Sequence, residues 1–402
     1  MKKFLALLLA LVMSLSLVAC GGGDDTAADG GADAEDGGNA ETAAYQVAMI
    51  TDYGDITDQS FNQTTYEACQ EFCDAEGLQF EYYKPAGDST AERVAMVDAA
   101  VADGYNVIVM PGYAFAETIK ETAELYPDVT FIALDVAQGD LGEDYTVPSN
   151  VYCAVYQEEL CGYMAGYAAV KLGYKNLGFL GGMAVPAVQR YGYGFVQGVD
   201  AAAAELELTD VKLNYAYGNQ FFGDADITAA MDTWYAGGTE IVFACGGGIY
   251  TSAVDAAKKV EGAKVIGVDV DQAGVIANYA AGEGADAATV EGYKALTVTS
   301  AMKGLYPATF DTLTDVIVNG NWEKYSGKID TLGLVSADDP AANYVQIPME
   351  STQWADGKFT QDDYKALVKA MFDGTLTVSN DITKAAKDFA TVITVDDQGN
   401  IK

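Results

Sequence analysis

The sequence predicts an α/β protein with two similar lobes, each built on a parallel β-sheet. Strand-like and helix-like segments alternate along the chain, which is typical of parallel sheets with helices on both faces. The segment from residue 45 to residue 402 is also longer than one hydrophobic core usually organises, which favours two lobes. Three positions recur with the same residue type 134 residues later: Gly112 and Gly246, Asp135 and Asp269, and Gln138 and Gln272.

The first copy of this repeat is expected to begin with a strand over residues 46–50, which is a short apolar run. The helix after it, at about residues 64–75, carries apolar or small side chains at helical spacing. Further strands are expected at residues 78–83, 106–110 and 130–134, and further helices at about residues 90–102 and 115–125.

The second copy is expected to follow the same order. Its strands are predicted at residues 176–180, 211–217, 240–244 and 264–268, and its helices at about residues 188–205, 225–235 and 251–260. A Gly-, Ala- and acid-rich connection over residues 273–295 precedes strands near 296–300, 331–335 and 344–347 and helices near 307–318 and 362–372. We therefore expect lobe 1 over residues 45–160, lobe 2 over residues 161–295, and crossover segments with a C-terminal helix over residues 296–402.

The first 20 residues predict a secretory leader and not a part of the fold. Lys2 and Lys3 precede an apolar run over residues 4–18, which is too short for a comfortable membrane span. The run ends in Leu-Val-Ala-Cys-Gly, which resembles the bacterial lipobox and implies a lipidated (palmitate-bearing) Cys20 as the mature N-terminus. An ordinary secretory signal with a coincidental cysteine is the alternative.

Residues 21–44 are expected to form a disordered tether. They consist mainly of Gly, Ala, Asp and Glu, with no Lys or Arg, so they cannot bury a core. No later apolar run reaches 18 residues, so we expect a domain held near the membrane by its lipid and not by a spanning helix.

The composition excludes several classes of function. With 59 acidic and 22 basic residues, the chain has a formal net charge of −37, which excludes binding to a nucleic-acid backbone. It contains no His, which removes Ser-His-Asp and Cys-His catalysis and the commonest metal ligand. Five scattered cysteines follow Cys20, and we expect buried thiols, not disulfides; Cys69 and Cys73 share a helix face but make a weak zinc site. We expect no enzyme activity, metal or cofactor.

The loop over residues 51–62 is the first candidate binding element. It contains three aspartates and then Ser60, which is expected to cap the next helix, followed by Phe61 and Asn62. An aromatic side chain beside an amide at a helix N-terminus can stack on a flat ring and hydrogen-bond its edge. The alternative is a hydrophobic staple at a capped helix. Loops at the carboxyl ends of parallel strands carry the ligand sites of open α/β sheets.

Five motifs in a fixed order give the sequence a specific resemblance. They are Asp-x-Ser-Phe-Asn at 58–62, Pro-Gly-Tyr at 111–113, NLGFLGGM at 176–183, ACGGG at 244–248 and GVDVDQ at 267–272. Together they resemble the basic membrane protein family of bacterial substrate-binding lipoproteins, which includes the purine nucleoside receptors of ABC importers. The resemblance covers about residues 45–350 and implies a type I periplasmic-binding-protein fold, with two Rossmann-like lobes joined by hinge crossovers.

The resemblance implies roles for residues of the first lobe. Phe61 would stack on one face of the purine and Asn62 would bond its edge. Asp135 would supply a second group at the base edge, and Asp52 or Asp58 would orient the first loop.

In the second lobe, the resemblance implies contacts to the other face of the base and to the ribose. Phe221 would close the other face, and we favour it over Phe222. Asp269 would take the ribose hydroxyls, helped by a backbone N–H group at Gly247 or Gly248.

Lys303 would reach the ribose or Asp269, and Tyr113 is a further candidate. These positions also have structural interpretations. Lys303 can be a surface charge, Asp269 can cap the loop that follows it, and Phe221 and Phe222 can pack in the core or divide between core and site. The glycines at 246–248 can form a phosphate loop, although they lack the G-x-G-x-x-G spacing.

The sequence therefore predicts a monomeric, lipid-anchored binding protein on the extracytoplasmic face of the cell membrane. It would capture a purine nucleoside by hinge closure and pass it to an ABC permease. Carboxylates accept hydrogen bonds from a vicinal diol but repel phosphate, which favours a nucleoside over a nucleotide. The alternatives are a solute-sensing surface lipoprotein with a sugar or another nucleoside-like ligand, and a nucleoside hydrolase that uses Asp135 and Asp269.

Overall fold

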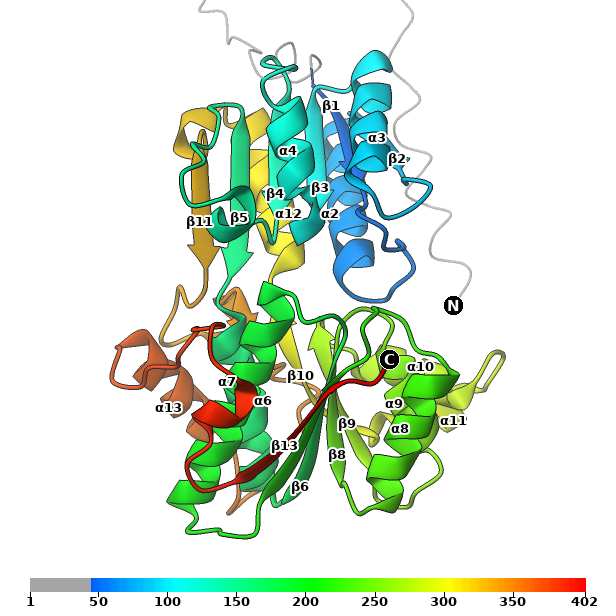
Figure 1. Cartoon of the computed structure of the whole chain (residues 1–402), viewed down its shortest axis with the longest axis vertical. Helices are drawn as coiled ribbons and strands as arrows, with labels where there is room; N and C mark the ends of the chain where they lie inside the picture. Colours follow the sequence, from blue (N-terminus) through cyan, green and yellow to red (C-terminus); the bar gives the residue numbers. More distant parts are fainter. Residues whose placement is uncertain (1–44) are drawn as a thin grey trace, which may run out of the picture. The chain divides into compact units, whose positions relative to one another are not determined.

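The computed structural model describes residues 45–402 (Figure 1). The predicted leader, the lipidation site at Cys20 and the tether over residues 21–44 lie outside the described residues. From residue 45 onward, no helix combines the length and the hydropathy that crossing a bilayer requires.

The first of two sheets is entirely parallel, as predicted. Its strand order is β11-β5-β4-β3-β1-β2. The strands are β1 (Gln46–Ile50), β2 (Gln79–Tyr83), β3 (Val107–Pro111), β4 (Thr130–Leu134), β5 (Val151–Tyr156) and β11 (Lys328–Leu332). In this order, the chain reverses direction across the sheet between β1 and β3, and open α/β sheets bind ligands at that switch point.

The second sheet repeats the arrangement and adds an edge strand. Its order is β12-β10-β9-β8-β6-β7-β13, and every pairing is parallel except that of β10 with β12. The strands are β6 (Asn176–Gly181), β7 (Lys212–Tyr217), β8 (Ile241–Cys245), β9 (Lys264–Asp269), β10 (Thr297–Lys303), β12 (Val345–Gln346) and β13 (Thr394–Asn400). Its switch point lies between β6 and β8.

Helices cover both faces of each sheet (Figure 1). The first sheet carries α2 (Phe61–Glu76), α3 (Thr90–Ala102), α4 (Ala116–Thr122), α5 (Gln138–Leu141) and α12 (Leu305–Leu313). The second carries α6 (Glu158–Leu172), α7 (Pro186–Glu205), α8 (Ala225–Ala236), α9 (Tyr250–Ala257), α10 (Ala273–Ala281), α11 (Ala287–Lys294) and α13 (Gln361–Phe372).

Alternate residues of the central strands face opposite cores, as the two-residue period of a strand requires. In β1, Val47 and Met49 belong to the core that contains Phe72 of α2, whereas Ala48 and Ile50 belong to the core that contains α3. The same alternation holds in the second sheet. The core that contains α2 continues into α6 and α7, so one apolar cluster runs through both sheets.

The internal repeat is confirmed in the backbone. Strands β3 and β4 pair Val107 with Thr130, and β8 and β9 pair Ile241 with Lys264, 134 residues later at both positions. The glycines after β3 and β8 have φ of 130° and 143°. Asp135 and Asp269 have φ of 62° and 63°, the left-handed conformation that Asp tolerates better than most residues.

Three crossovers join the sheets and are hydrogen-bonded to one another. The chain passes from β5 to α6 at Gln157, from β10 to α12 at Gly304, and from β11 to β12 between Gly333 and Tyr344. Gln157 N donates to Leu332 O (3.0 Å), Gly304 N to Tyr344 O (2.7 Å) and Tyr344 N to Gly333 O (3.0 Å). These three connections are the predicted crossovers between the lobes.

Several elements depart from the sequence prediction. Strands β5 and β13 and helix α6 were not predicted, and the connection over residues 273–295 contains α10 and α11. The predicted helix at 307–318 begins earlier, as α12, and ends in a π-helical turn at Thr314–Val318. The five cysteines of the described residues are buried free thiols, as expected.

Candidate functional site

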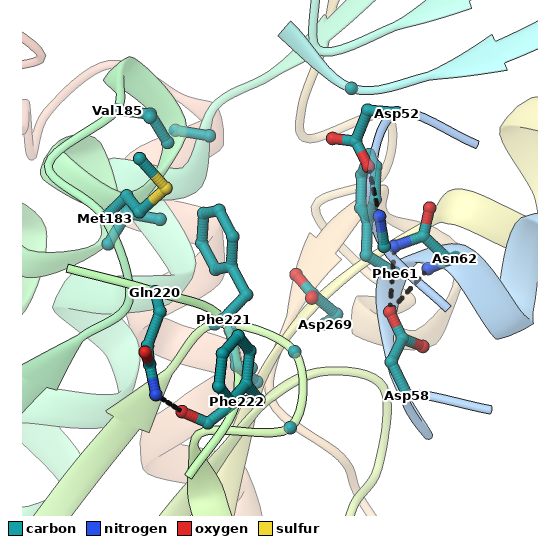
Figure 2. A pocket seen from close by; sticks show the side chains of 18 of the residues that line it. Asp52, Asp58, Phe61, Asn62, Met183, Val185, Gln220, Phe221, Phe222 and Asp269 are labelled. Atoms are coloured by element: carbon teal, nitrogen blue, oxygen red, sulfur yellow. Dashed lines mark hydrogen bonds between the residues drawn. The ribbon is translucent and has the colours of Figure 1, made fainter. Parts of the chain in front are cut away.

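A cavity of about 490 Å³ opens between the carboxyl ends of the two sheets. The loops after β1, β2, β3 and β4 line one side. The loops after β6, β7 and β8, with the last residues of β9 and β10, line the other. The cavity wall contains every side chain or glycine predicted to bind ligand: Phe61, Asn62, Asp135, Phe221, Gly247, Asp269, Lys303, Asp52, Asp58, Tyr113, Phe222 and Gly248. Figure 2 shows the aromatic and apolar wall of the second lobe facing the polar wall of the first.

The N-terminus of α2 is capped by Asp58 and not by Ser60. The Asp58 carboxylate accepts hydrogen bonds from the backbone N–H groups of Ser60 (2.9 Å), Asn62 (3.0 Å) and Gln63 (3.1 Å). Ser60 occupies the cap position, but its hydroxyl donates to Asp269 Oδ2 (2.6 Å) in the other lobe. The prediction that Ser60 caps the helix was wrong, because the nearby carboxylate offers two acceptor oxygens to the same N–H groups.

Asn62 is held by the same carboxylate. Its Nδ2 donates to Asp58 Oδ2 (3.0 Å), and the side chain is 7% exposed. Its Oδ1 is buried and has no hydrogen-bond partner among residues 45–402. Most buried polar atoms are paired, so an unpaired acceptor in a cavity wall is available to a ligand.

Asp52 holds the start of the loop. Its Oδ1 accepts from the backbone N–H groups of Tyr53 (2.6 Å) and Gly54 (2.8 Å). Burial raises the pKa of the Asp52 carboxyl to about 6, against the lowering effect of these two hydrogen bonds. Asp52 and Asp58 therefore both order the loop that carries Phe61 and Asn62.

Lys303 is buried at the centre of a charged cluster and is not a surface residue. Its Nζ lies 2.6 Å from Asp135 Oδ2, 3.6 Å from Glu158 Oε1 and 4.0 Å from Asp269 Oδ1. Burial lowers the pKa of Lys303, but the three carboxylates outweigh it and raise the pKa above its usual value. The ammonium therefore stays charged and is already committed to acidic partners.

Aromatic rings enclose the same ammonium. Lys303 Nζ lies over the rings of Phe61 (4.7 Å), Tyr156 (5.2 Å) and Tyr191 (5.8 Å). The π face of an aromatic ring attracts a cation, and the attraction is stronger when the cation is removed from water. Behind it, Arg190 Nε donates to Glu158 Oε2 (2.6 Å), so the cluster continues into α7.

Asp269 faces the cavity and does not cap its own loop. Its oxygens accept from Ser60 Oγ (2.6 Å) and from the Tyr191 hydroxyl (3.1 Å). The loop is instead tied by Gln272, whose Oε1 accepts from Val268 N (2.9 Å). Burial raises the pKa of Asp269, while Lys303 and Ser60 lower it.

Phe221 and Phe222 both line the cavity, and neither is buried in the core. Phe221 is half-buried and stacks against Tyr53 of the other lobe, with ring centroids 6.3 Å apart and planes at 27°. Gly182 makes room for this ring, since a Cβ there would lie 2.4 Å from it. Phe222 is 62% exposed. Phe221 packs against the edge of the core and also lines the cavity, so the pair does not divide into one core residue and one site residue.

The two glycines predicted as backbone donors, in the loop after β8, differ in their hydrogen bonding. Gly248 N donates to Phe221 O (2.8 Å), so its N–H group is occupied. Gly247 has a φ of 49° and lines the cavity. Of the two predicted backbone donors, Gly247 is the one whose N–H group is free within the described chain.

Several cavity or supporting residues were not predicted. Tyr53 lies in the first loop itself and could have been found from that position, and Met183 is the last residue of the motif NLGFLGGM. Glu158, Arg190 and Tyr191 carry no local signal, because their partners lie far away in the sequence.

Comparison with known proteins identifies relatives of this architecture. A family model described as ABC transporter substrate-binding protein PnrA-like matches residues 45–338. The ABC transporter nucleoside-binding protein BmpA of Lactococcus lactis subsp. cremoris is 27% identical over 239 residues. The matched residues make up 56% of this chain and 64% of BmpA, so the chain spans slightly less than two thirds of that relative. A CD4+ T-cell-stimulating antigen of Listeria innocua is 28% identical over 285 residues, 67% of this chain and 74% of that protein.

A solved structure confirms the predicted fold. The crystal structure of an ABC transporter solute-binding protein from Aeropyrum pernix K1 superposes with a TM-score of 0.62 and 20% identity. The superposition covers 86% of this chain and 90% of the chain in the crystal structure. The architecture is therefore the type I periplasmic-binding-protein fold.

Proposed function

Because this chain belongs to the PnrA-like family of ABC transporter substrate-binding proteins, we propose that it captures a purine nucleoside and delivers it to an ABC permease. The observation that carries the proposal is a cavity with an aromatic ring from each lobe, Phe61 and Phe221, and with buried acceptors in its wall. A purine has two faces that stack and an edge that hydrogen-bonds, and this cavity offers a partner for each.

The base would lie between the two rings. Lys303 lies over the Phe61 ring, so a purine would use the face turned toward Phe221. Stacking on an aromatic side chain contributes about 1–3 kcal/mol per base in nucleic-acid binders. Asn62 Oδ1 and Asp135 Oδ1, both buried and unpaired, would accept hydrogen bonds from the base edge.

The ribose would meet Asp269, Lys303 and the free N–H group of Gly247. A carboxylate accepts two hydrogen bonds from a vicinal diol, and the ammonium beside it donates to the same hydroxyls. For this, the hydroxyls would replace or share the hydrogen bond that Ser60 now gives to Asp269.

The charges of the cavity support a nucleoside and not a nucleotide. Six aspartates line it, and Lys303 is already paired with Asp135 and Glu158. A phosphate would meet carboxylates without a free cation to balance them, which is unfavourable at short range.

The mechanism would be closure about the three crossovers, with no covalent step. Direct hydrogen bonds already join the lobes across the cleft: Ser60 to Asp269, Lys303 to Asp135, and Gln272 Nε2 to Gln59 O (3.2 Å). Such contacts would stabilise a closed form around the ligand. We also propose that lipidated Cys20 and the tether hold the protein as a monomer on the extracytoplasmic face of the membrane.

A thermal-shift panel tests the proposed function. It would contain adenosine, guanosine, inosine, uridine, ribose and several amino acids. A ligand at 100 times its Kd adds about 2.7 kcal/mol, which raises the Tm by several degrees. A shift with purine nucleosides supports the proposal, and a shift with another solute alone would keep the transport role and reject the purine.

A further inference from the structure

The amide of Asn62 is fixed in one orientation by a residue beside it. Asp58 Oδ2 accepts from both the backbone N–H group and Nδ2 of Asn62, each at 3.0 Å. An ionised carboxylate only accepts hydrogen bonds, so the amide must turn its NH₂ toward Asp58. Figure 2 shows the two side chains joined in this way at the cavity wall.

The loop backbone packs against the other side of the amide. A Cβ at Gly54 would lie 2.1 Å from Asn62 Nδ2, so the plane of the amide is held in place. Packing does not distinguish C=O from NH₂, so the hydrogen bond to Asp58 alone decides which end of the amide faces the cavity. Its Oδ1 is left buried, unpaired and in the wall of the cavity.

A second acceptor has the same character. Asp135 Oδ1 is buried and unpaired, while the other oxygen of this carboxylate accepts from Lys303. The polar hydrogens of Ser60 and Tyr191 are directed at Asp269. The side chains around the base position therefore present acceptors in excess of free donors.

We propose that the cleft selects purine nucleosides that carry an amino group, and that Asp58 determines this selectivity by fixing Asn62. The inference rests on the proposed function and narrows its ligand class. Guanine presents N1–H and a 2-amino group, and adenine presents a 6-amino group. Hypoxanthine has a single N–H on that edge and no amino group, so one of the two acceptors, Asn62 Oδ1 or Asp135 Oδ1, would be left without a donor. A site built to bond an N–H group rejects the analogue that lacks it.

Asp58 acts here as a positioning residue, so its substitution should change the selectivity. In Asp58→Asn, the new carbonyl oxygen keeps the backbone N–H groups of Ser60 and Gln63, and the new NH₂ faces Asn62, whose backbone N–H group loses its acceptor. The Asn62 amide then turns its oxygen to that NH₂ and presents its own NH₂ to the cavity. The acceptor becomes a donor, which removes the advantage of a base that carries a second N–H group on this edge.

The experiment measures the Kd of adenosine, guanosine and inosine by isothermal titration calorimetry on the full chain and its variants. In the unsubstituted protein, the better of the two amino nucleosides should bind on the order of tenfold more tightly than inosine. Asp58→Asn should abolish or invert this ratio. Asp286→Asn is the matched control. Asp286 also caps a helix, since its carboxylate accepts from Thr289 N (2.8 Å), but it lies outside the cavity. The ratio of the nucleoside Kd values should therefore stay unchanged in this variant.

Inosine binding as tightly as both amino nucleosides would overturn the inference and leave the proposed function standing. An unchanged ratio in Asp58→Asn would also overturn it. If Asp58→Asn does not fold or bind, Asn62→Ala decides: it should bind all three nucleosides with similar, weaker affinity, and retention of the original ratio contradicts the inference. Failure of every nucleoside to bind the unsubstituted protein would instead overturn the proposed function.

Discussion

Two aspartates show how single residues are placed by the repeat. Asp135 directly follows β4, Asp269 is the last residue of β9, and both adopt the left-handed conformation. This turn points both carboxylates into one cavity from opposite lobes, where Lys303 lies between them. Their shared position was predictable from the 134-residue offset, but their shared cation was not.

The residues that escaped prediction are those whose role depends on distant partners. The sequence suggested Ser60 as a helix cap, and only the fold brings Asp269 to its hydroxyl. Glu158 and Arg190 are 32 residues apart, and nothing local indicates that they pair. The predicted wall residues were found because motifs mark them, whereas the supporting residues have no motif.

The buried carboxyl group of Glu159 makes the stability of the folded protein depend on pH. Burial raises its pKa to about 7, the neighbouring Glu158 adds to this, and its Oε2 has no partner. An unfolded glutamate ionises near 4.5, so between that pH and 7 the native state binds the extra proton. Stability therefore falls as pH rises through this window.

Glu159→Gln removes this titration. The fall in unfolding free energy between pH 5 and pH 8 should shrink by about 2 kcal/mol, as measured by urea denaturation at both pH values. The exposed Glu283→Gln is the control and should not alter the fall. A fall of the original size in Glu159→Gln would show that the carboxyl is not buried as described.

At the scale of elements, α6 and α7 form a closely packed pair (Figure 1). Glycines on both helices allow the approach, and a Cβ at Gly194 or Gly198 would lie 2.1 Å from a backbone carbonyl oxygen of α6. The pair carries Glu158 on one helix and Arg190 and Tyr191 on the other. The packing thus supports the charged cluster behind Lys303.

Gly198→Ala should destabilise the protein. The added methyl group meets the Tyr163 carbonyl, which is backbone and cannot move aside easily, and overpacking of this kind costs about 1–3 kcal/mol. Gly274→Ala in α10 is the matched control, since nothing lies within 4 Å of its Cβ position. Alanine is the better helix former, so the control should be neutral or more stable by up to about 1 kcal/mol. Equal urea midpoints for the two variants would contradict the close packing.

The elements that were not predicted lack the usual signals. Helix α6 is buried on nearly all sides, so it has no polar face from which to recognise a helical period. Strand β13 is polar and mostly exposed, and it forms because the edge of β7 is available to pair with it. The strands and helices of the two repeat copies were predictable because their apolar periods are clear.

At the scale of the molecule, the two-lobed plan was predictable from the repeat, and the hinge was predictable only in outline. The sequence shows strands that follow the second copy, but not which sheet each one joins. In the structure, β11 joins the first sheet, whereas β10, β12 and β13 join the second. The sheet that each of these strands joins depends on tertiary packing. The result is that the three crossovers lie next to one another, where they are joined by hydrogen bonds.

The central claim is that a purine nucleoside binds between Phe61 and Phe221, and calorimetric titration of the protein with adenosine and guanosine tests it most directly. A micromolar Kd corresponds to about 8 kcal/mol, which two stacking contacts and several hydrogen bonds can supply. Phe61→Ala should weaken binding by roughly tenfold or more, whereas Phe372→Ala, at an exposed position of α13, should leave it unchanged. Binding that is absent in the unsubstituted protein, or equally strong in Phe61→Ala, would contradict the account.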